Sequence, residues 1–135
     1  MSKPKAFVRR PDEGRLYAMG RMSAKFVADG SETGSRLSVS EWWLEPNTVA
    51  PHVPNPHSHP EDHLFYVIEG EVSVQLEGTW HSAEAGTYIY IPGGTEHTFE
   101  NRTASKSAFL SINNPGGFEN AMQGIVDWFN QNAGS

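Results

Sequence analysis

The central part of the chain, residues 56–101, reads PHSHPEDHLFYVIEGEVSVQLEGTWHSAEAGTYIYIPGGTEHTFEN. It contains four short runs rich in β-branched and aromatic residues, at 63–69, 71–77, 87–91 and 97–101. Turn signals separate these runs: Gly70, Gly78, the AEAG at 83–86 and the ProGlyGly at 92–94. Such regular spacing is typical of short strands joined by tight turns.

Two further strands are expected on either side of this stretch, at 36–45 (RLSVSEWWLE) and at 107–113 (SAFLSIN). Nothing between the predicted strands is long enough for a crossover helix, so the sheets should be antiparallel. The pattern therefore predicts an all-β sandwich or closed barrel.

We expect one domain over residues 1–135, because the length suits a single core. Residues 1–35 form an N-terminal arm whose apolar islands, Leu16-Tyr17 and Phe26-Val27, suggest edge strands, and residues 36–114 form the barrel. After the PGG at 115–117 the apolar residues take a helical period, which predicts one short C-terminal helix over 117–131. Its buried face would carry Phe118, Met122, Ile125 and Phe129.

Composition excludes several classes of protein. The chain has no cysteine, which rules out disulfides, thiolate nucleophiles and cysteine-ligated metals. Its formal net charge is -6 and its ten Lys and Arg are scattered, which argues against nucleic-acid partners. No apolar run is long enough to span a membrane, so we expect a cytoplasmic protein.

Four of the six histidines are candidate metal ligands. His57 and His59 are two residues apart, so on an extended chain both imidazoles point to one face. His63 begins the next strand, where Phe65 shares its face, and His97 follows the 86–94 hairpin. Imidazole suits Zn, Cu, Fe, Ni and Mn ions. The other two, His52 and His81, are expected to be surface residues.

The segment 86–101 matches the motif G(x)5PxG(x)2H(x)3N at every fixed position, and it resembles the second motif of the cupin superfamily. The first cupin motif, G(x)5HxH(x)3–4E(x)6G, is present through His57, His59 and Gly70, with Pro51 in place of its first glycine and His63 at its glutamate position. The segment SINNPGGFE, 111–119, also resembles a signature of small quercetin-dioxygenase-like cupins.

This resemblance implies a double-stranded β-helix (cupin or jelly-roll barrel) that holds one divalent transition-metal ion, Mn, Fe, Zn or Ni. It assigns His57, His59 and His97 directly as ligands, and His63 by position. A fourth imidazole in place of the glutamate leaves the charge of the ion uncompensated, so anionic ligands should be drawn to it. If His63 leaves the metal, it becomes a candidate base. No other catalytic residue is assigned.

Several other residues are expected near the site. Phe65, Phe99 and Trp43 are predicted to line an apolar pocket beside the ion. Glu61 and Asp62 are alternative bases, but in a Pro-Glu-Asp turn we expect both to face water.

Three functions fit these observations. The first is a metal-dependent oxygenase acting on an enol, diketone or phenolic molecule. The second is a metal-dependent isomerase, epimerase or cyclase of sugar acids or polyketides. The third is a small-molecule-binding cupin without catalysis. Small cupins commonly form homodimers by exchanging an N-terminal strand, and the first thirty-five residues are a candidate for this exchange.

Overall fold

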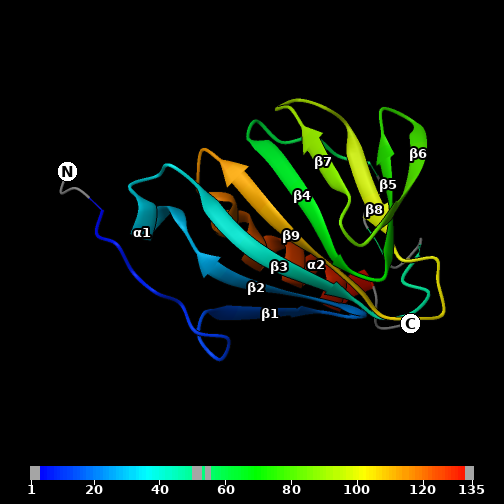
Figure 1. The fold of residues 1–135 in the computed structure, drawn as a ribbon, viewed down its shortest axis with the longest axis horizontal. Helices are drawn as coiled ribbons and strands as arrows, with labels where there is room; N and C mark the ends of the chain where they lie inside the picture. The colour runs from blue at the N-terminus through cyan, green and yellow to red at the C-terminus, as the bar shows by residue number, and fades with distance from the viewer. Residues whose placement is uncertain (1–3, 50–52, 54–55, 133–135) are drawn as a thin grey trace.

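The computed structural model describes residues 4–49, 53 and 56–132. In this part of the chain nine strands build two antiparallel sheets (Figure 1). The six-stranded sheet has the order β1-β2-β3-β9-β4-β7, and the three-stranded sheet has the order β6-β5-β8. The strands are β1 Arg15–Met19, β2 Met22–Ala28, β3 Ser38–Leu44, β4 Asp62–Glu69, β5 Glu71–Leu76, β6 Thr79–Glu84, β7 Tyr88–Ile91, β8 His97–Glu100 and β9 Ser107–Asn114.

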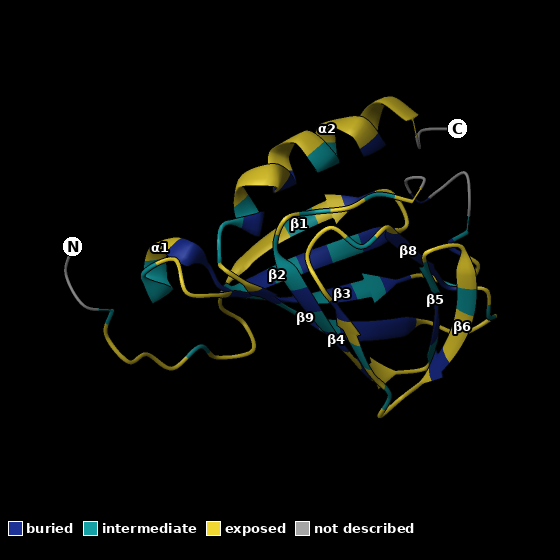
Figure 2. Ribbon diagram, turned by 90° about the horizontal axis from the view of Figure 1, so that it is seen from above, coloured by how far each residue is buried: buried dark blue, intermediate teal, exposed yellow. Residues whose placement is uncertain are grey.

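The apolar residues of the two sheets point toward each other and form one buried core. On β4, the side chains of His63, Phe65 and Val67 are buried, whereas Tyr66 and Ile68 are exposed. This is the alternation expected of a strand with one face in the core. Figure 2 shows buried and half-buried residues alternating along β2 and β3 of the same sheet.

The N-terminal arm differs from expectation at its second island. β1 is the edge of the six-stranded sheet, but β2 lies between β1 and β3 and is an internal strand. Its buried residues Met22, Ala24, Phe26 and Ala28 alternate with half-buried ones. Two small alanines weaken this pattern in the sequence, so the strand is longer and more central than its Phe26-Val27 core indicates.

Two short elements escape the sequence pattern. β6, whose sequence is TWHSAE, buries only Ala83, so it lacks the apolar alternation that reveals a strand. It is held by its ladder to β5. Helix α1 (Gly30–Thr33) is a single turn closed by a capping box between Asp29 and Glu32.

The C-terminal helix is present as expected. A 3₁₀ turn η1 (Phe118–Ala121) leads into helix α2 (Met122–Asn132), which packs along β1. Phe118, Met122 and Phe129 are buried and Ile125 is half-buried, which confirms the predicted face. Among the described residues no helix is long and apolar enough to cross a membrane.

Candidate metal centre

The histidines come together because two sheets and one loop meet at the same end of the core. His63 is the second residue of β4 in the larger sheet, and His97 is the first residue of β8 in the smaller one. The loop before β4 is joined to β8 by two backbone hydrogen bonds, His57 N–H to His97 O at 2.9 Å and His97 N–H to His57 O at 2.8 Å. The loop therefore runs alongside β8 and brings His57 close to His97.

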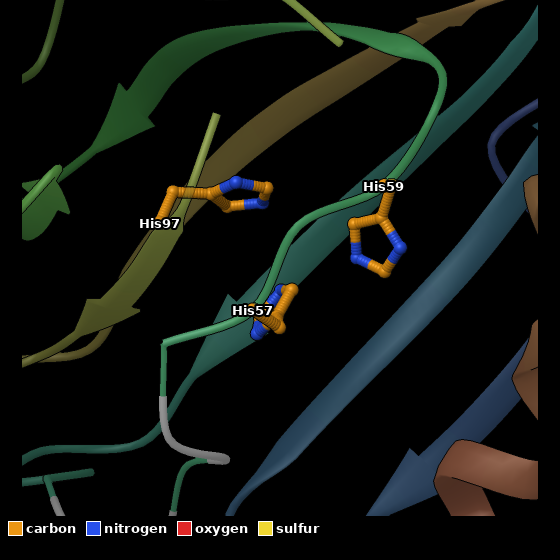
Figure 3. A group of neighbouring side chains, drawn as sticks. All are labelled: His57, His59 and His97. Carbon is orange, nitrogen blue, oxygen red and sulfur yellow. The ribbon is translucent and has the colours of Figure 1, made fainter. Parts of the chain in front are cut away.

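Three of the four predicted ligands form a compact cluster. One ring nitrogen each from His57, His59 and His97 lies within 4.8 Å of the others. The ring centroids of His57 and His97 are 4.6 Å apart, and those of His57 and His59 are 4.8 Å apart. Figure 3 shows the three rings arranged around a common space.

His63 lies beside this cluster, but it is not among the three residues whose ring nitrogens lie within 4.8 Å of one another. Its ring centroid lies 5.2 Å from the ring of His59 and 5.2 Å from the ring of His97. Its Nδ1 is hydrogen-bonded to Asn113 Oδ1 of the neighbouring strand β9. Its Nε2 is buried and has no hydrogen-bond partner among the described residues.

The buried side chain of Asn113 contributes to the position of His63. Asn113 is 1% exposed. Its Nδ2 donates to Ser38 Oγ at 3.3 Å, and Ser111 Oγ donates to its Oδ1 at 3.4 Å. Hydrogen bonds of this kind to the second ring nitrogen commonly orient metal-binding histidines. Asn113 and Ser38 were not predicted from the sequence, because nothing in a strand sequence reveals a partner on the next strand.

The imidazoles of His59, His63 and His97 are neutral at physiological pH. Burial lowers the pKa of His59 to about 3, and the positive charges that His57, His63 and His97 would carry lower it further. Burial also lowers the pKa of His97 to about 4, despite its hydrogen bond to the Thr95 carbonyl. Burial likewise lowers the pKa of His63, although its bond to Asn113 acts in the opposite direction. Each of these three rings therefore keeps the lone pair that a metal needs.

These residues fit a transition-metal ion. All four side chains offer nitrogen, the donor preferred by late first-row ions. A buried nitrogen without a hydrogen bond, as at His63 Nε2, costs free energy unless another partner is bound.

An apolar cavity of about 380 Å³ adjoins the four histidines. Seven of the sixteen residues that line it are Phe or Trp, namely Trp42, Phe65, Phe99, Phe109, Phe118, Trp128 and Phe129. Apart from the histidines, Ser111 is the one residue with a hydroxyl, amide or charged side chain among the described residues that line it.

The prediction for this pocket needs one correction. Phe65 and Phe99 line the cavity, but Trp43 does not. Because successive residues of a strand face opposite sides, Trp42 points inward and Trp43 outward, where Lys106 Nζ lies 5.7 Å from its ring centroid. The alternation of buried Ser38, Ser40 and Trp42 carries this information, but serines hide the inward face in the sequence.

The other polar residues considered in the sequence lie around the site. Asp62 Oδ1 accepts a hydrogen bond from Gly93 N–H at 2.8 Å. Glu61 was expected to face water, but its Oε1 is buried and has no hydrogen-bond partner among the described residues. His81 is exposed on β6, as expected, and His52 lies outside the described residues.

The PGGFE segment at 115–119 leads into the C-terminal helix and packs against the histidines through Phe118. The ring of Phe118 lies 5.0 Å from that of His59 and 5.6 Å from that of His63. Glu119 Oε2 accepts a hydrogen bond from Gly30 N–H at 2.8 Å, which ties the turn to the start of α1. At Gly116 an added Cβ would lie 2.7 Å from the Leu37 carbonyl oxygen, so only glycine allows this close approach.

Comparisons with known proteins agree with this architecture. The chain is 28% identical over 94 residues to quercetin 2,3-dioxygenase of Bacillus subtilis (strain 168), in a match that covers 69% of this chain and 27% of that enzyme. Its fold is similar to that of KdgF from Halomonas sp., with a TM-score of 0.72 at 20% identity, over 85% of this chain and 98% of that one. It is also similar to the polyketide cyclase RemF from Streptomyces resistomycificus, with a TM-score of 0.66 at 24% identity, over 82% and 79% of the two chains.

The sequence itself matches a family model described as Cupin domain over residues 41–113. The matched part includes the three clustered histidines, His63 beside them, and the strands from β4 to β8. Because it spans more than half of the 135 residues, this chain belongs to the cupin family.

Proposed function

We propose that this protein is a metal-dependent oxygenase that holds one divalent transition-metal ion through His57, His59, His63 and His97 and acts on an apolar, enolisable small molecule. The observation that carries the proposal is the position of these imidazoles at an aromatic cavity of about 380 Å³. The similarity to quercetin 2,3-dioxygenase, over part of that enzyme, supports the choice of reaction.

The protein's contribution to the metal centre is a set of neutral nitrogen donors. The low pKa values of His59 and His97 mean that protons do not compete for these rings at physiological pH. When bound, the ion would supply Lewis acidity and redox chemistry. With no carboxylate among the four donors, its positive charge favours an anionic partner such as an enolate or phenolate.

The cavity wall indicates the rest of the ligand. Aromatic rings and aliphatic groups surround the space, and they exclude water from any molecule held there. A sugar acid needs several hydrogen-bond partners for its hydroxyl groups, and Ser111 alone is a poor match among the described wall residues. A phenol, flavonol or β-diketone matches better, because it has one chelating edge and an apolar body.

Oxygen uptake tests this proposal. The protein loaded with Mn(II) or Fe(II) is mixed without air with a catechol, a β-diketone or a flavonol, and its metal spectrum is recorded. The spectrum should change on addition, and dioxygen should be consumed once air is admitted. No oxygen uptake with any of these compounds refutes the oxygenase assignment.

A second candidate is a cyclase that uses the ion as a Lewis acid without oxygen. The aromatic wall supports it, because a folded polyketide also presents apolar rings with a few enolic oxygens. Conversion of such a substrate by the zinc-loaded protein in the absence of dioxygen would select this candidate, because Zn(II) has no redox chemistry.

A further inference from the structure

Helix α2 contributes the solvent-facing side of the cavity. Gly124, Ile125 and Trp128 of α2 lie on one helical face, continue the i, i+3, i+4, i+7 spacing that begins at Ala121 in η1, and line the cavity together with Ala121. Trp128 is 38% exposed, whereas His63 and His97 are 4% and 2% exposed. The cavity therefore extends from the buried histidines to the partly open face of α2, which Figure 2 shows lying along the sheet.

Gly124 is unusual on this face because glycine destabilises the interior of a helix. Two reasons usually explain such a glycine, a positive φ or a close backbone contact. Gly124 is absent from the residues with positive φ, and an added Cβ would meet no atom within 4 Å. The backbone and its packing therefore do not require glycine here.

We propose that Gly124 is a specificity-determining residue whose missing side chain leaves room for the apolar end of the ligand. The ligand class is an enolisable β-dicarbonyl or a phenol that carries a bulky aryl group. Its chelating oxygens lie toward the histidines and its aryl group passes Gly124 toward the ring of Trp128. The ligand's chelating end rests on the proposed function, whereas the size limit at Gly124 rests on the cavity alone.

The experiment compares Gly124→Leu and Gly124→Ala with the control Gln123→Leu, which places the same side chain on the adjacent, exposed residue of α2. In the metal-free protein the probe is 1-anilinonaphthalene-8-sulfonate, followed by its fluorescence. In the Mn(II)-loaded protein the probes are pentane-2,4-dione and 1,3-diphenylpropane-1,3-dione, which share a chelating group and differ in size. Binding of the two diketones is followed by the quenching of tryptophan fluorescence, to which Trp42 and Trp128 in the cavity wall contribute.

We expect Gly124→Leu to lower the affinity for the naphthalene probe and for the diphenyl diketone by roughly tenfold or more. The affinity for pentane-2,4-dione should fall by no more than about twofold. Gly124→Ala should give an intermediate loss and should melt at or above the wild-type temperature, which shows that the helix is intact. Gln123→Leu should bind all three probes as the wild type does.

Three outcomes overturn the proposal: a wild-type protein that does not bind the naphthalene probe, a Gly124→Leu variant that binds it equally well, or equal losses in Gly124→Leu and Gln123→Leu. The proposed function fails separately. If Gly124→Leu excludes the naphthalene probe but the metal-loaded wild type binds neither diketone, the size limit stands and the assigned substrate class is wrong.

Discussion

Replacing Asn113 by leucine should weaken metal binding although none of the proposed metal ligands is changed. Asn113 is 1% exposed and is hydrogen-bonded to Nδ1 of His63, which is itself 4% exposed. Leucine has a similar size, so the change removes hydrogen bonds and leaves little empty space. The His63 ring then loses the contact that fixes its orientation.

The magnitude follows from the groups left without partners. His63 Nδ1 becomes an unsatisfied buried group, and the hydroxyl of Ser38, 0% exposed, loses a donor. One unsatisfied buried polar group costs about 1–3 kcal/mol, so the free energy of unfolding of the metal-free variant should be lower by that amount. Loss of a group that orients a ligand typically lowers metal affinity by about 10- to 100-fold.

The assay is competition for Mn(II) or Zn(II) against a chelator of known affinity, together with thermal unfolding of the metal-free protein. Asn130→Leu is the matched control, because Asn130 is an exposed residue of α2. It should leave the metal affinity unchanged. The reasoning is refuted if Asn113→Leu remains folded and binds the metal as tightly as the wild type.

Three further predictions concern stability and pH. Gly124→Ala should raise the free energy of unfolding by roughly 0.5–1 kcal/mol, measured by urea denaturation, because it removes the helix cost of glycine without a steric clash. Phe109→Ala should lower it by roughly 3–5 kcal/mol in the same measurement, because Phe109 is 1% exposed and packs against Trp42, Phe65 and Phe99. In the metal-free protein the pKa of His59 is about 3 and that of His97 about 4, below the ordinary 6.5, so the unfolded chain binds more protons than the folded one between these values. The contribution of these two residues to the free energy of unfolding should therefore be fully present above pH 6.5 and should decrease as the pH drops toward 4 and then 3. Melting temperatures that rise on acidification over this range would contradict the assignment.

Much of the fold is visible in the sequence because the central strands have one apolar face and clear turn signals. The run HLFYVIE alternates along β4, and the ProGlyGly turn precedes β8. β6 cannot be recognised in the sequence because it buries only Ala83, and β2 resembles an edge strand there because alanines obscure its pattern. In both strands the pairing with a neighbour, which a local pattern cannot show, decides the structure.

The site divides in the same way. His57, His59 and His97 were identified from spacing and a motif, and the structure brings all three together. Trp42 lines the cavity in place of the predicted Trp43, because two adjacent tryptophans in a sequence give no indication of which one faces inward. Asn113 lies in the 111–119 segment and Gly124 in no motif, and the importance of both depends on contacts and empty space that only the folded chain creates.

The central claim, one ion held by four histidines, is tested most directly by the metal content of the purified wild type and of the four single variants His57→Ala, His59→Ala, His63→Ala and His97→Ala. We expect about one ion per chain in the wild type, since three of its proposed donors form a single cluster with His63 beside it, and well below one in each variant. A wild type with far less than one ion per chain would contradict the metal centre. A His63→Ala variant with full metal content and unchanged affinity would show instead that His63 is not a ligand.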